Sequence, residues 1–534
     1  MNILNHLLDK SAEFKKITAA FEKNAFPIGI SGAADAQKAH LVSELCEHEN
    51  RPAFIITHSE QAAKRLYEDL RFFSEHGCIY VPPRDIVLYE VEAADRKADN
   101  DRAYALSRLD GTAIGIASVE SFMQTVPDAE NLSSLRFVLR EGGKADLSEL
   151  SERLVKIGYT RVITVDSPGQ FAIRGGIADI FPPGADNGIR AEFFGDDIDS
   201  VRSFDCDTQL SIKRLEEAEI IPVRTAAEAS SLFSYIPRDT IIFFDEPLRI
   251  GEAAKAVEWE IGENIKTLAE KDVEIKNEKP INTYAEIMAE AEKRSLVGIS
   301  SLSAVFPDMP LCADLSVTAK GMGGYGGNIE FLVEDLRRWL SEKYRIAILG
   351  GSSSRAAKIR EMLTAYEIKC IFAPQAEELS DEYITVVSGS ITHGFEYPLE
   401  KVIVISDKEI FAEEKKRRSR TSIHDDNIAK IKSVDKLEPG DLVVHRAHGI
   451  GKYLGIVSMK VKGVSKDYIK IAYRGEDFLY LPVGQLDAVS KYTGGSENSI
   501  VRLNKLGSNE WANARKKVKS SVQEMAQRLV ALYA

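Results

Sequence analysis

The chain has 534 residues and carries 69 lysine and arginine residues against 82 aspartate and glutamate residues, a net charge of −13. A hydrophobic content of 44% with 28% charged residues is ordinary for a globular chain and excludes a disordered or fibrous protein. At roughly 100 to 200 residues per domain the length predicts three to five domains, and no apolar run approaches the roughly 20 residues that cross a bilayer.

The first part of the chain alternates short apolar runs, bounded by turn residues, with segments of helical spacing. The apolar runs predict buried strands at Phe26–Ser31, Ala53–Thr57, Cys78–Val81 and Ala113–Ser118. The helical spacing predicts helices at Ser59–Ser74 and Asp99–Leu109. Because β and α units alternate, we expect a mostly parallel sheet in a three-layer arrangement.

From about Phe137 the pattern changes to short strands separated by Gly- and Pro-rich turns, preceded by a predicted helix at Leu147–Ile157. The predicted strands are Tyr159–Asp166, Gln170–Ile173, Gly176–Phe181 and Ile189–Phe194. They indicate a small antiparallel β module. The α/β pattern returns after about Ile221, with a strand at Thr240–Phe244 and a helix at Ile250–Glu270, so the module is interpreted as an insertion in the first domain.

The Gly-rich segment Gly321–Gly327 predicts a flexible linker that opens a second α/β unit. The elements predicted for this unit are a helix at Glu330–Lys343, a strand at Arg345–Gly350, a helix at Ser354–Tyr366, and strands at Thr385–Ser388 and Lys401–Ser406. A second linker is predicted around the basic run Lys415–Arg420, which is interpreted as a solvated segment between domains. Closely spaced strands then indicate a small β-barrel, at Leu442–His445, Gly451–Val461, Tyr468–Tyr473 and Phe478–Pro482.

The C-terminal segment predicts one long helix that Ser508 or Asn509 can cap. Apolar residues recur along it at three- and four-residue steps, namely Trp511, Ala514, Val518, Val522, Met525, Leu529 and Leu532. Because no Gly or Pro stop signal precedes Ala534, the helix is expected to be cut by the end of the chain. Residues 433–534 carry 16 lysine and arginine residues against 10 acidic ones, so the acidic average conceals a basic end.

The turn after the first predicted strand stands where an ATPase has its phosphate-binding loop. Such a loop reads G-x-x-x-x-G-K-[ST], in which the lysine neutralises the phosphates and the hydroxyl holds magnesium. The corresponding positions here are Gly29, Gly32, Ala34, Asp35 and Ala36. Asp35 would place a carboxylate beside the phosphates, and Lys38 follows too late in the helix to substitute. The turn is therefore interpreted as a packing feature that does not hydrolyse ATP.

Other candidate chemistry is weak. Asp245 and Glu246 follow an apolar strand as the magnesium-binding acidic pair of ATPases does, but without a lysine-bearing loop a simple strand end is favoured. His445 and His448 offer two imidazoles, whereas zinc normally needs further ligands, so a turn is favoured there too. No serine or cysteine nucleophile motif is found. We therefore predict no catalytic residue and no metal site, and expect a binding function.

The location predicted for the chain is the cytoplasm. The N-terminus lacks the basic segment and apolar core of a secretion signal. The cysteines are scattered and are expected to be reduced, at Cys46, Cys78, Cys206, Cys312 and Cys370. No membrane partner is expected.

Three stretches resemble known domains. Residues 170–182 (QFAIRGGIADIFP) and 189–196 (IRAEFFGD) closely resemble domain 2 of the excision-repair protein UvrB. Residues 389–411, which begin GSITHGFEYP and end ISDKEIF, resemble the third domain of the transcription-repair coupling factors, the Mfd family. Residues 439–453 (PGDLVVHRAHGIGKY) resemble the RNA polymerase-interacting domain of that family and of CarD-type regulators. Their order is similar to the Mfd family across essentially the whole chain.

The resemblance implies a multidomain fold of α/β and β parts. The expected first domain is a UvrB-like α/β domain with a degenerate P-loop in two segments (1–135 and 223–318), into which an antiparallel UvrA-binding module (136–222) is inserted. A Gly-rich linker (319–328) and a small third α/β domain (329–412) are expected to follow. The remaining expected parts are a basic linker (413–432), a Tudor/SH3-like β-barrel (433–507) and a truncated long linking helix (508–534). In the family a motor that uses ATP and magnesium and moves along double-stranded DNA follows. That motor is not recognised here, so no cofactor is expected in this chain.

The resemblance also implies two protein partners, UvrA and the β subunit of RNA polymerase. The positions that match UvrA-binding ones are Arg161, Arg174, Phe181, Phe193 and Phe194. An arginine fork beside an exposed aromatic ring would bind a partner well, although the phenylalanines would equally fill a small core. For polymerase, an exposed strand edge would add a strand, and the candidates are Lys460, Lys462, Lys466, Ile469 and Ile471. The sequence does not decide which face of residues 466–473 is core.

The expected function is that of a non-catalytic part of a transcription-coupled repair factor, which links stalled polymerase to UvrA. Two alternatives remain from other classes. One is an ATP-dependent helicase or translocase in its own right. The other is a UvrB-like DNA-damage-binding protein, which the short, charged segment Pro82–Arg102 disfavours because UvrB clamps DNA there with an aromatic hairpin.

Overall fold

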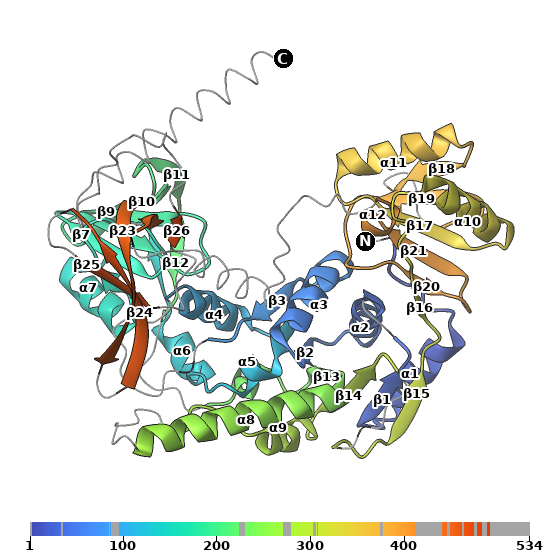
Figure 1. Cartoon of the computed structure of the whole chain (residues 1–534), viewed down its shortest axis with the longest axis horizontal. Helices are drawn as coiled ribbons and strands as arrows, with labels where there is room; N and C mark the ends of the chain where they lie inside the picture. The colour runs from blue at the N-terminus through green and yellow to red at the C-terminus, as the bar shows by residue number, and fades with distance from the viewer. Residues whose placement is uncertain are drawn as a thin grey trace, which may run out of the picture. The chain divides into compact units, whose positions relative to one another are not determined.

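The computed structural model describes residues 3–33, 36–84, 86, 96–223, 230–270, 279–302, 306, 308–373, 378–411, 440–445, 449–461, 464–474, 478–482 and 489–491. These residues fall into two compact units, one made of those up to 411 and the other of those from 440 to 491 (Figure 1). In this described part of the chain, no helix is both long and apolar enough to cross a membrane.

The first unit is built on a parallel sheet of seven strands in the order β15-β1-β14-β13-β2-β4-β3. The strands are β1 (Ile28–Ser31), β2 (Ala53–Thr57), β3 (Cys78–Val81), β4 (Ile114–Ser118), β13 (Ile241–Asp245), β14 (Ser295–Ser300) and β15 (Ala313–Ser316). The central strands are buried throughout, which explains their continuous apolar runs. The predicted parallel sheet is confirmed, whereas β14 and β15 were not predicted.

Helices cover both faces of this sheet and create two hydrophobic cores. In β2, Ile55 points into one core while Phe54 and Ile56 point into the other, as the alternation of side chains along a strand requires. The helices are α1 (Ala12–Glu22), α2 (Ala36–Glu49), α3 (Glu60–Phe73), α4 (Arg96–Arg108), α5 (Val119–Met123), α6 (Ala129–Leu135), α8 (Pro247–Glu270) and α9 (Tyr284–Ala291), with a 3-10 turn at Leu232–Tyr235.

The chain leaves this sheet after β4 and returns to it at β13, and a β module lies between. Six of its strands pair in the order β11-β10-β9-β8-β7-β6, all antiparallel except β6 with β7, and β12 pairs with β5. The strands are β5 (Phe137–Arg140), β6 (Thr160–Arg161), β7 (Gln170–Arg174), β8 (Ile177–Phe181), β9 (Gly188–Phe194), β10 (Asp197–Phe204), β11 (Ser211–Leu215) and β12 (Glu217–Ile220). Helix α7 (Leu147–Lys156) buries Leu150 and Leu154 against one face. Strand β6 is shorter than predicted, and the charge-rich strands β10 to β12 were missed.

A mixed sheet in the same unit has the order β16-β20-β21-β17-β19-β18. Its elements are β16 (Lys320–Gly321), α10 (Ile329–Ser341), β17 (Arg345–Leu349), α11 (Ser353–Ala365), β18 (Cys370–Phe372), β19 (Ile384–Val387), β20 (Phe395–Tyr397), β21 (Val402–Ser406) and α12 (Asp407–Ile410). The Gly-rich segment predicted as a flexible linker is tied to this sheet. The backbone N–H groups of Met322 and Tyr325 donate to the carbonyl oxygens of Gly394 and Glu409 at 3.1 and 2.7 Å.

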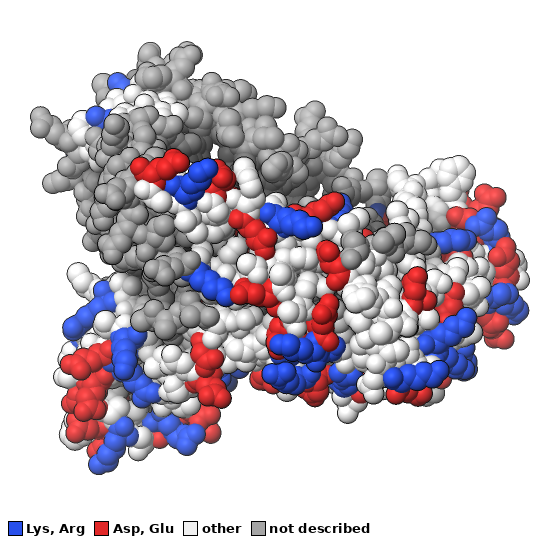
Figure 2. Space-filling view, turned by 90° about the horizontal axis from the view of Figure 1, so that it is seen from below, with Lys and Arg blue, Asp and Glu red and all other residues white. Residues whose placement is uncertain are grey.

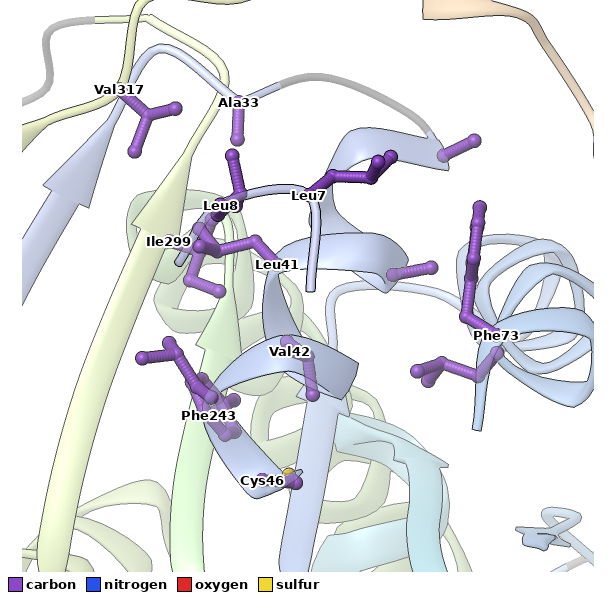
Figure 3. Close-up of a cluster of buried hydrophobic side chains, with 14 of the residues drawn as sticks. Leu7, Leu8, Ala33, Leu41, Val42, Cys46, Phe73, Phe243, Ile299 and Val317 are labelled. Atoms are coloured by element: carbon purple, nitrogen blue, oxygen red, sulfur yellow. The ribbon is translucent and has the colours of Figure 1, made fainter. Parts of the chain in front are cut away.

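The parallel and mixed sheets share one hydrophobic core. Figure 3 shows part of it, with Leu41 and Val42 of α2 beside Phe243 of the parallel sheet. Phe395 and Tyr397 of the mixed sheet belong to the same buried cluster. The third α/β region is therefore packed directly on the first.

Buried polar contacts also join these two sheets. Asp69 on α3 accepts hydrogen bonds from the backbone nitrogen and from Oγ1 of Thr392, both at 2.6 Å. His40 on α2 contacts the hydroxyl of Tyr397 at 3.1 Å through Nδ1. Burial raises the pKa of Asp69 to about 6 in spite of the two bonds from Thr392, so this carboxylate depends strongly on those donors.

Replacing Thr392 tests this junction. Thr392→Val keeps the backbone donor and removes Oγ1, and we expect it to lower the free energy of unfolding by about 1–3 kcal/mol because a buried acceptor loses a partner. Chemical denaturation measures this change. Thr318→Val is the matched control, since Thr318 binds Glu13 through the same two groups at 2.7 and 2.8 Å in an exposed site, and its cost should stay within about 0.5 kcal/mol. Equal losses for the two variants would contradict a buried role for Thr392.

The second unit is a five-stranded antiparallel sheet in the order β25-β24-β23-β22-β26. The strands are β22 (Leu442–His445), β23 (Gly449–Val461), β24 (Val464–Ala472), β25 (Phe478–Pro482) and β26 (Val489–Lys491). The four predicted strands are present, and β26 was not predicted. Closure of this sheet into a Tudor/SH3-like barrel stays a prediction. The predicted basic linker (413–432) and long helix (508–534) lie outside the described residues.

Candidate functional sites

The turn between β1 and α2 is shaped by close packing. Gly32 has a φ of +96°, and a Cβ on it would lie 2.2 Å from the carbonyl oxygen of Val317. A Cβ on Gly29 would lie 2.6 Å from the nearest core side chain. The two glycines thus allow neighbouring segments to approach, which favours the packing interpretation of this turn. Of the remaining positions Ala36 is buried at the start of α2, and two lie outside the described residues, Ala34 and Asp35.

Lys38, in the first turn of α2, fills the place in which a nucleotide site would bind its metal. Its Nζ donates to Asp245 Oδ1 at 2.5 Å and to Glu246 Oε1 at 2.7 Å. The lysine side chain is only 9% exposed. Sequence reasoning noticed all three residues but missed the contact among them. The sequence did hold one signal for this contact. Lys38 is a cation in the first turn of a helix, where the helix macrodipole disfavours a positive charge.

Glu246 is held in its charged form by this contact. Burial alone would raise the pKa of Glu246, but the charge and hydrogen bond of Lys38, with further bonds from Ser301, lower it to about 2. The Ser301 backbone nitrogen and Oγ donate to Glu246 Oε1 at 2.8 and 2.7 Å. Burial likewise acts to lower the pKa of Lys38, yet Asp245 and Glu246 raise it overall. The three side chains therefore form a buried ion-paired cluster.

This geometry suits the ammonium group of Lys38, in a structural role, better than it suits a metal ion with a bound phosphate. The carboxylates that would bind magnesium already surround an ammonium group supplied by the chain itself. A magnesium ion at Asp245 would have to displace Lys38 Nζ, and Lys38 would then be buried beside the metal without its partners. The cluster can fasten α2 to the end of β13, but as arranged it cannot position a triphosphate.

Removing the lysine charge tests this assignment. Lys38→Met should lower the free energy of unfolding by about 3–5 kcal/mol near neutral pH, because two carboxylates lose their buried partner. The same denaturation curves should not shift when magnesium and ATP are added to the wild-type chain, since a ligand that binds the native state would stabilise it.

The difference in the free energy of unfolding between the wild type and Lys38→Met should change with pH in a defined direction. The pKa of Glu246 falls from 4.5 to about 2 on folding, so its contribution is present above about 4.5 and is lost as pH falls toward 2. The pKa of Lys38 is raised above 10.5, so its contribution is complete below 10.5. The gap between wild type and Lys38→Met should therefore be constant from about pH 5 to 10 and narrow in acid. Lys64→Met, which removes an exposed pair with Glu60, should show no comparable gap. A gap that persists unchanged at pH 2 would refute the ion-pair explanation.

The face of the β module opposite α7 carries a ladder of charges across four strands. We call it the arginine face, and its charged residues are Arg174, Asp179, Arg190, Glu192 and Arg202. Asp179 is fully buried and accepts from Arg174 Nη2 and from Arg190 Nε, both at 2.6 Å. Arg202 approaches Glu192 to 3.2 Å. Arg174 is 50% exposed and is thus the arginine of the Asp179 cluster that a partner can reach.

The other residues predicted for UvrA binding divide between surface and core. Arg161 is exposed on β6, and Phe194 at the end of β9 is 84% exposed. Phe193 points to the opposite face and packs partly against the core under α7. Phe181 is only 8% exposed and belongs to a small cluster with Phe204. Of the two roles that the sequence left open for Phe181, the structure therefore favours the core role over that of an exposed aromatic contact.

The second unit corrects part of the predicted polymerase site. Ile469 and Ile471 are buried, and β24 lies between β23 and β25, so neither their side chains nor that stretch of strand edge is available to a partner. Lys460 and Lys466 lie in β23 and β24, but their side chains, like Lys462 as a whole, are outside the described residues.

A different part of this unit is exposed and apolar. Strand β22 pairs with β23 as far as Lys452, and backbone hydrogen bonds from Gly440 and to Asp441 extend the contact to Tyr453. No described strand pairs with that side of β23 beyond Tyr453. Leu454 and Ile456 are exposed along this edge, although Ile456 pairs across the sheet with the buried Ile469. Phe478 is also exposed and lies 4.2 Å from Lys470 Nζ. Apolar side chains beside an unpaired edge are typical of a strand-addition site.

Of the two candidate histidines, the structure describes one. His445 lies in β22, and His448 is outside the described residues. Among the described residues, one group has ligand atoms within 4.8 Å of one another, namely His6, Asp9 and Glu44. Glu44 in this group already accepts from the backbone nitrogen of Leu7 at 3.1 Å.

Two family models match the parts of the chain that carry these surfaces. The model described as the UvrB interaction domain matches residues 137–225, which include the arginine face. The model described as the CarD-like/TRCF RID domain matches residues 437–493, which include the five-stranded sheet. The chain therefore combines a UvrB-type interaction module with a CarD-type domain.

Over its whole length the chain is similar to transcription-repair-coupling factors. That of Bacillus subtilis (strain 168) is 29% identical over 599 residues, which cover 100% of this chain and 51% of the relative. That of Staphylococcus haemolyticus (strain JCSC1435) is 27% identical over 597 residues, which cover 99% and 50%. The resemblance read from the sequence is confirmed, and the chain spans about half the length of the curated relatives it matches.

Proposed function

We propose that this chain links RNA polymerase to UvrA in transcription-coupled repair. The observation that carries the proposal is the presence of a UvrB interaction domain and a CarD-like/TRCF RID domain in one chain that is similar throughout to transcription-repair-coupling factors. Neither domain needs an active site for this task. Each needs an accessible surface, and the described residues offer one in each.

The UvrA contact is assigned to the arginine face and its surroundings. Arg174 offers a half-exposed guanidinium, and Phe194 adds an exposed ring. Arg161 is exposed on the neighbouring strand β6, but it pairs with Phe171 and therefore lies on the α7 side of the sheet. Arginine and aromatic side chains dominate the binding energy of protein interfaces. These residues therefore suit a partner with acidic groups around an apolar pocket.

Arg174→Ala should weaken binding to UvrA by about 2 kcal/mol, the loss typical of an interface arginine that carries much of the energy. Isothermal titration or surface plasmon resonance with purified UvrA measures this. Arg140→Ala is the control, because Arg140 is also an exposed arginine paired with a carboxylate, Glu217, but lies in the separate β5–β12 pair. Unchanged affinity of Arg174→Ala would remove this face from the interface.

The polymerase contact is assigned to the free edge of β23. An incoming strand would pair with the backbone beyond Tyr453 and would cover Leu454 and Ile456. Of the predicted lysines, Lys460 belongs to β23 itself, whereas Lys466 belongs to β24, which pairs with the other edge of β23. The burial of Ile469 and Ile471 moves the assignment from the middle of β24 to this edge.

Ile456→Asp should reduce binding to the isolated polymerase β subunit by at least about tenfold, because a charge would be buried against the added strand. The fold should survive, since the side chain is 50% exposed. Size-exclusion chromatography and biolayer interferometry without ATP measure the complex. Ile212→Asp, an equally exposed isoleucine in the β module, should bind the β subunit normally. Wild-type binding by Ile456→Asp would exclude this edge.

The alternatives fit less well. A helicase or translocase acting through the first domain would need the acidic pair that Lys38 occupies. A damage-binding protein would need a continuous basic track, whereas Figure 2 shows basic and acidic side chains interspersed on the face in view. Within this proposal, ATP, magnesium and double-stranded DNA belong to the motor of the coupling-factor family. The five-stranded sheet is proposed to close as a Tudor/SH3-like barrel, with residues 508–534 as a long helix.

A further inference from the structure

We infer that Asp179 is a positioning residue for UvrA binding, which orients the guanidinium of Arg174 toward a carboxylate of the partner. The inference rests on the proposed UvrA contact and extends it to a residue that no partner can touch, because Asp179 is fully buried. It also states the chemistry that the partner must present at this point.

The geometry around Asp179 is that of a fixed support. Arg190 binds it with two groups, Nε to Oδ1 at 2.6 Å and Nη2 to Oδ2 at 3.0 Å. Arg190 is itself held, because its Nη1 donates to the carbonyl oxygen of Gln209 at 3.2 Å and its guanidinium lies 4.7 Å from the ring of Phe204. All three nitrogens of the Arg190 side chain thus donate a hydrogen bond, and Asp179 cannot shift without disturbing the core of the module.

Arg174 differs from Arg190 in having much of its hydrogen-bonding capacity left. It donates to Asp179 Oδ2 through Nη2, and among the described residues Asp179 is its one partner. Its guanidinium is half exposed, so further N–H groups face solvent. One carboxylate shared between two guanidinium groups leaves one net positive charge, which is displayed at Arg174.

This arrangement selects an acidic partner group. A guanidinium whose rotation is restricted loses less entropy when it forms a second, two-pronged bond, so orientation favours a planar carboxylate over a single carbonyl. The ladder Arg174–Asp179–Arg190 is the part of the arginine face with a fully buried acid at its centre. The partner is therefore expected to place an aspartate or glutamate opposite Arg174.

Asp179→Asn distinguishes positioning from simple charge attraction, because the two explanations predict opposite changes in the affinity for UvrA. The substitution removes one negative charge and so makes the net charge of the face more positive by one, and attraction alone therefore predicts tighter binding to an acidic partner. Positioning predicts weaker binding by about tenfold, with most of the change in the dissociation rate, since Arg174 is released from its support. Surface plasmon resonance with purified UvrA gives both rates, and thermal melts establish that the variant is folded.

The double variant completes the test. If Asp179 acts through Arg174, Asp179→Asn should have almost no effect on UvrA binding in an Arg174→Ala background. A tenfold loss in that background, or tighter binding by the single variant, would overturn the inference. Loss of binding by Arg174→Ala with normal binding by Asp179→Asn would also overturn it, while leaving the proposed function intact. Failure of the wild-type chain to bind UvrA would instead reject the proposed function.

A second substitution covers the case in which Asp179→Asn does not fold. Arg174→Lys keeps the charge at the same position but replaces the planar fork by a single ammonium group. An oriented guanidinium predicts a loss of about tenfold for Arg174→Lys. Binding equal to that of the wild type would show that charge alone suffices and would contradict the inference.

Discussion

The buried contact of Lys38 with Asp245 and Glu246 fixes the position of α2, on which the first unit depends. The same helix turn carries Gln37, whose Nε2 donates to the carbonyl oxygen of Lys320 at 2.9 Å, and His40, which contacts Tyr397. One end of α2 is thus attached to the parallel sheet and to the mixed sheet at once. A buried charge needs its partners, so α2 cannot slide or rotate without leaving an ammonium group or a carboxylate uncompensated.

The same contact bears on where the proposed binding surfaces lie. A parallel sheet with a strand-to-helix turn at its carboxyl edge is a frequent place for nucleotide chemistry. Here that edge is filled by a lysine from the chain, and its glycines serve close packing rather than phosphate binding. The exposed groups that could recognise a partner lie instead on the β module and on the five-stranded sheet.

The sequence predicted those parts of the fold that local patterns encode. Strands β2, β3, β22 and β25 were located to the residue, because continuous apolar runs end at clear turn signals. Strand β10 was missed because its charged residues face solvent and break the run. The Lys38 contact could not be read locally, since its partner Asp245 lies 207 residues away. The buried face of β24 was undecided for a similar reason, because both faces carry apolar residues and only the rest of the sheet determines which is covered.

The two proposed surfaces rely on different forces, and this has a consequence for how they work together. The arginine face acts through charge, which salt screens over about 10 Å at ordinary ionic strength. The edge of β23 acts through backbone hydrogen bonds and apolar burial at Leu454 and Ile456, which salt affects little. Because the forces differ, either contact can be strengthened or weakened without altering the other. A linking protein benefits from this independence, since it must hold one partner while it waits for the second.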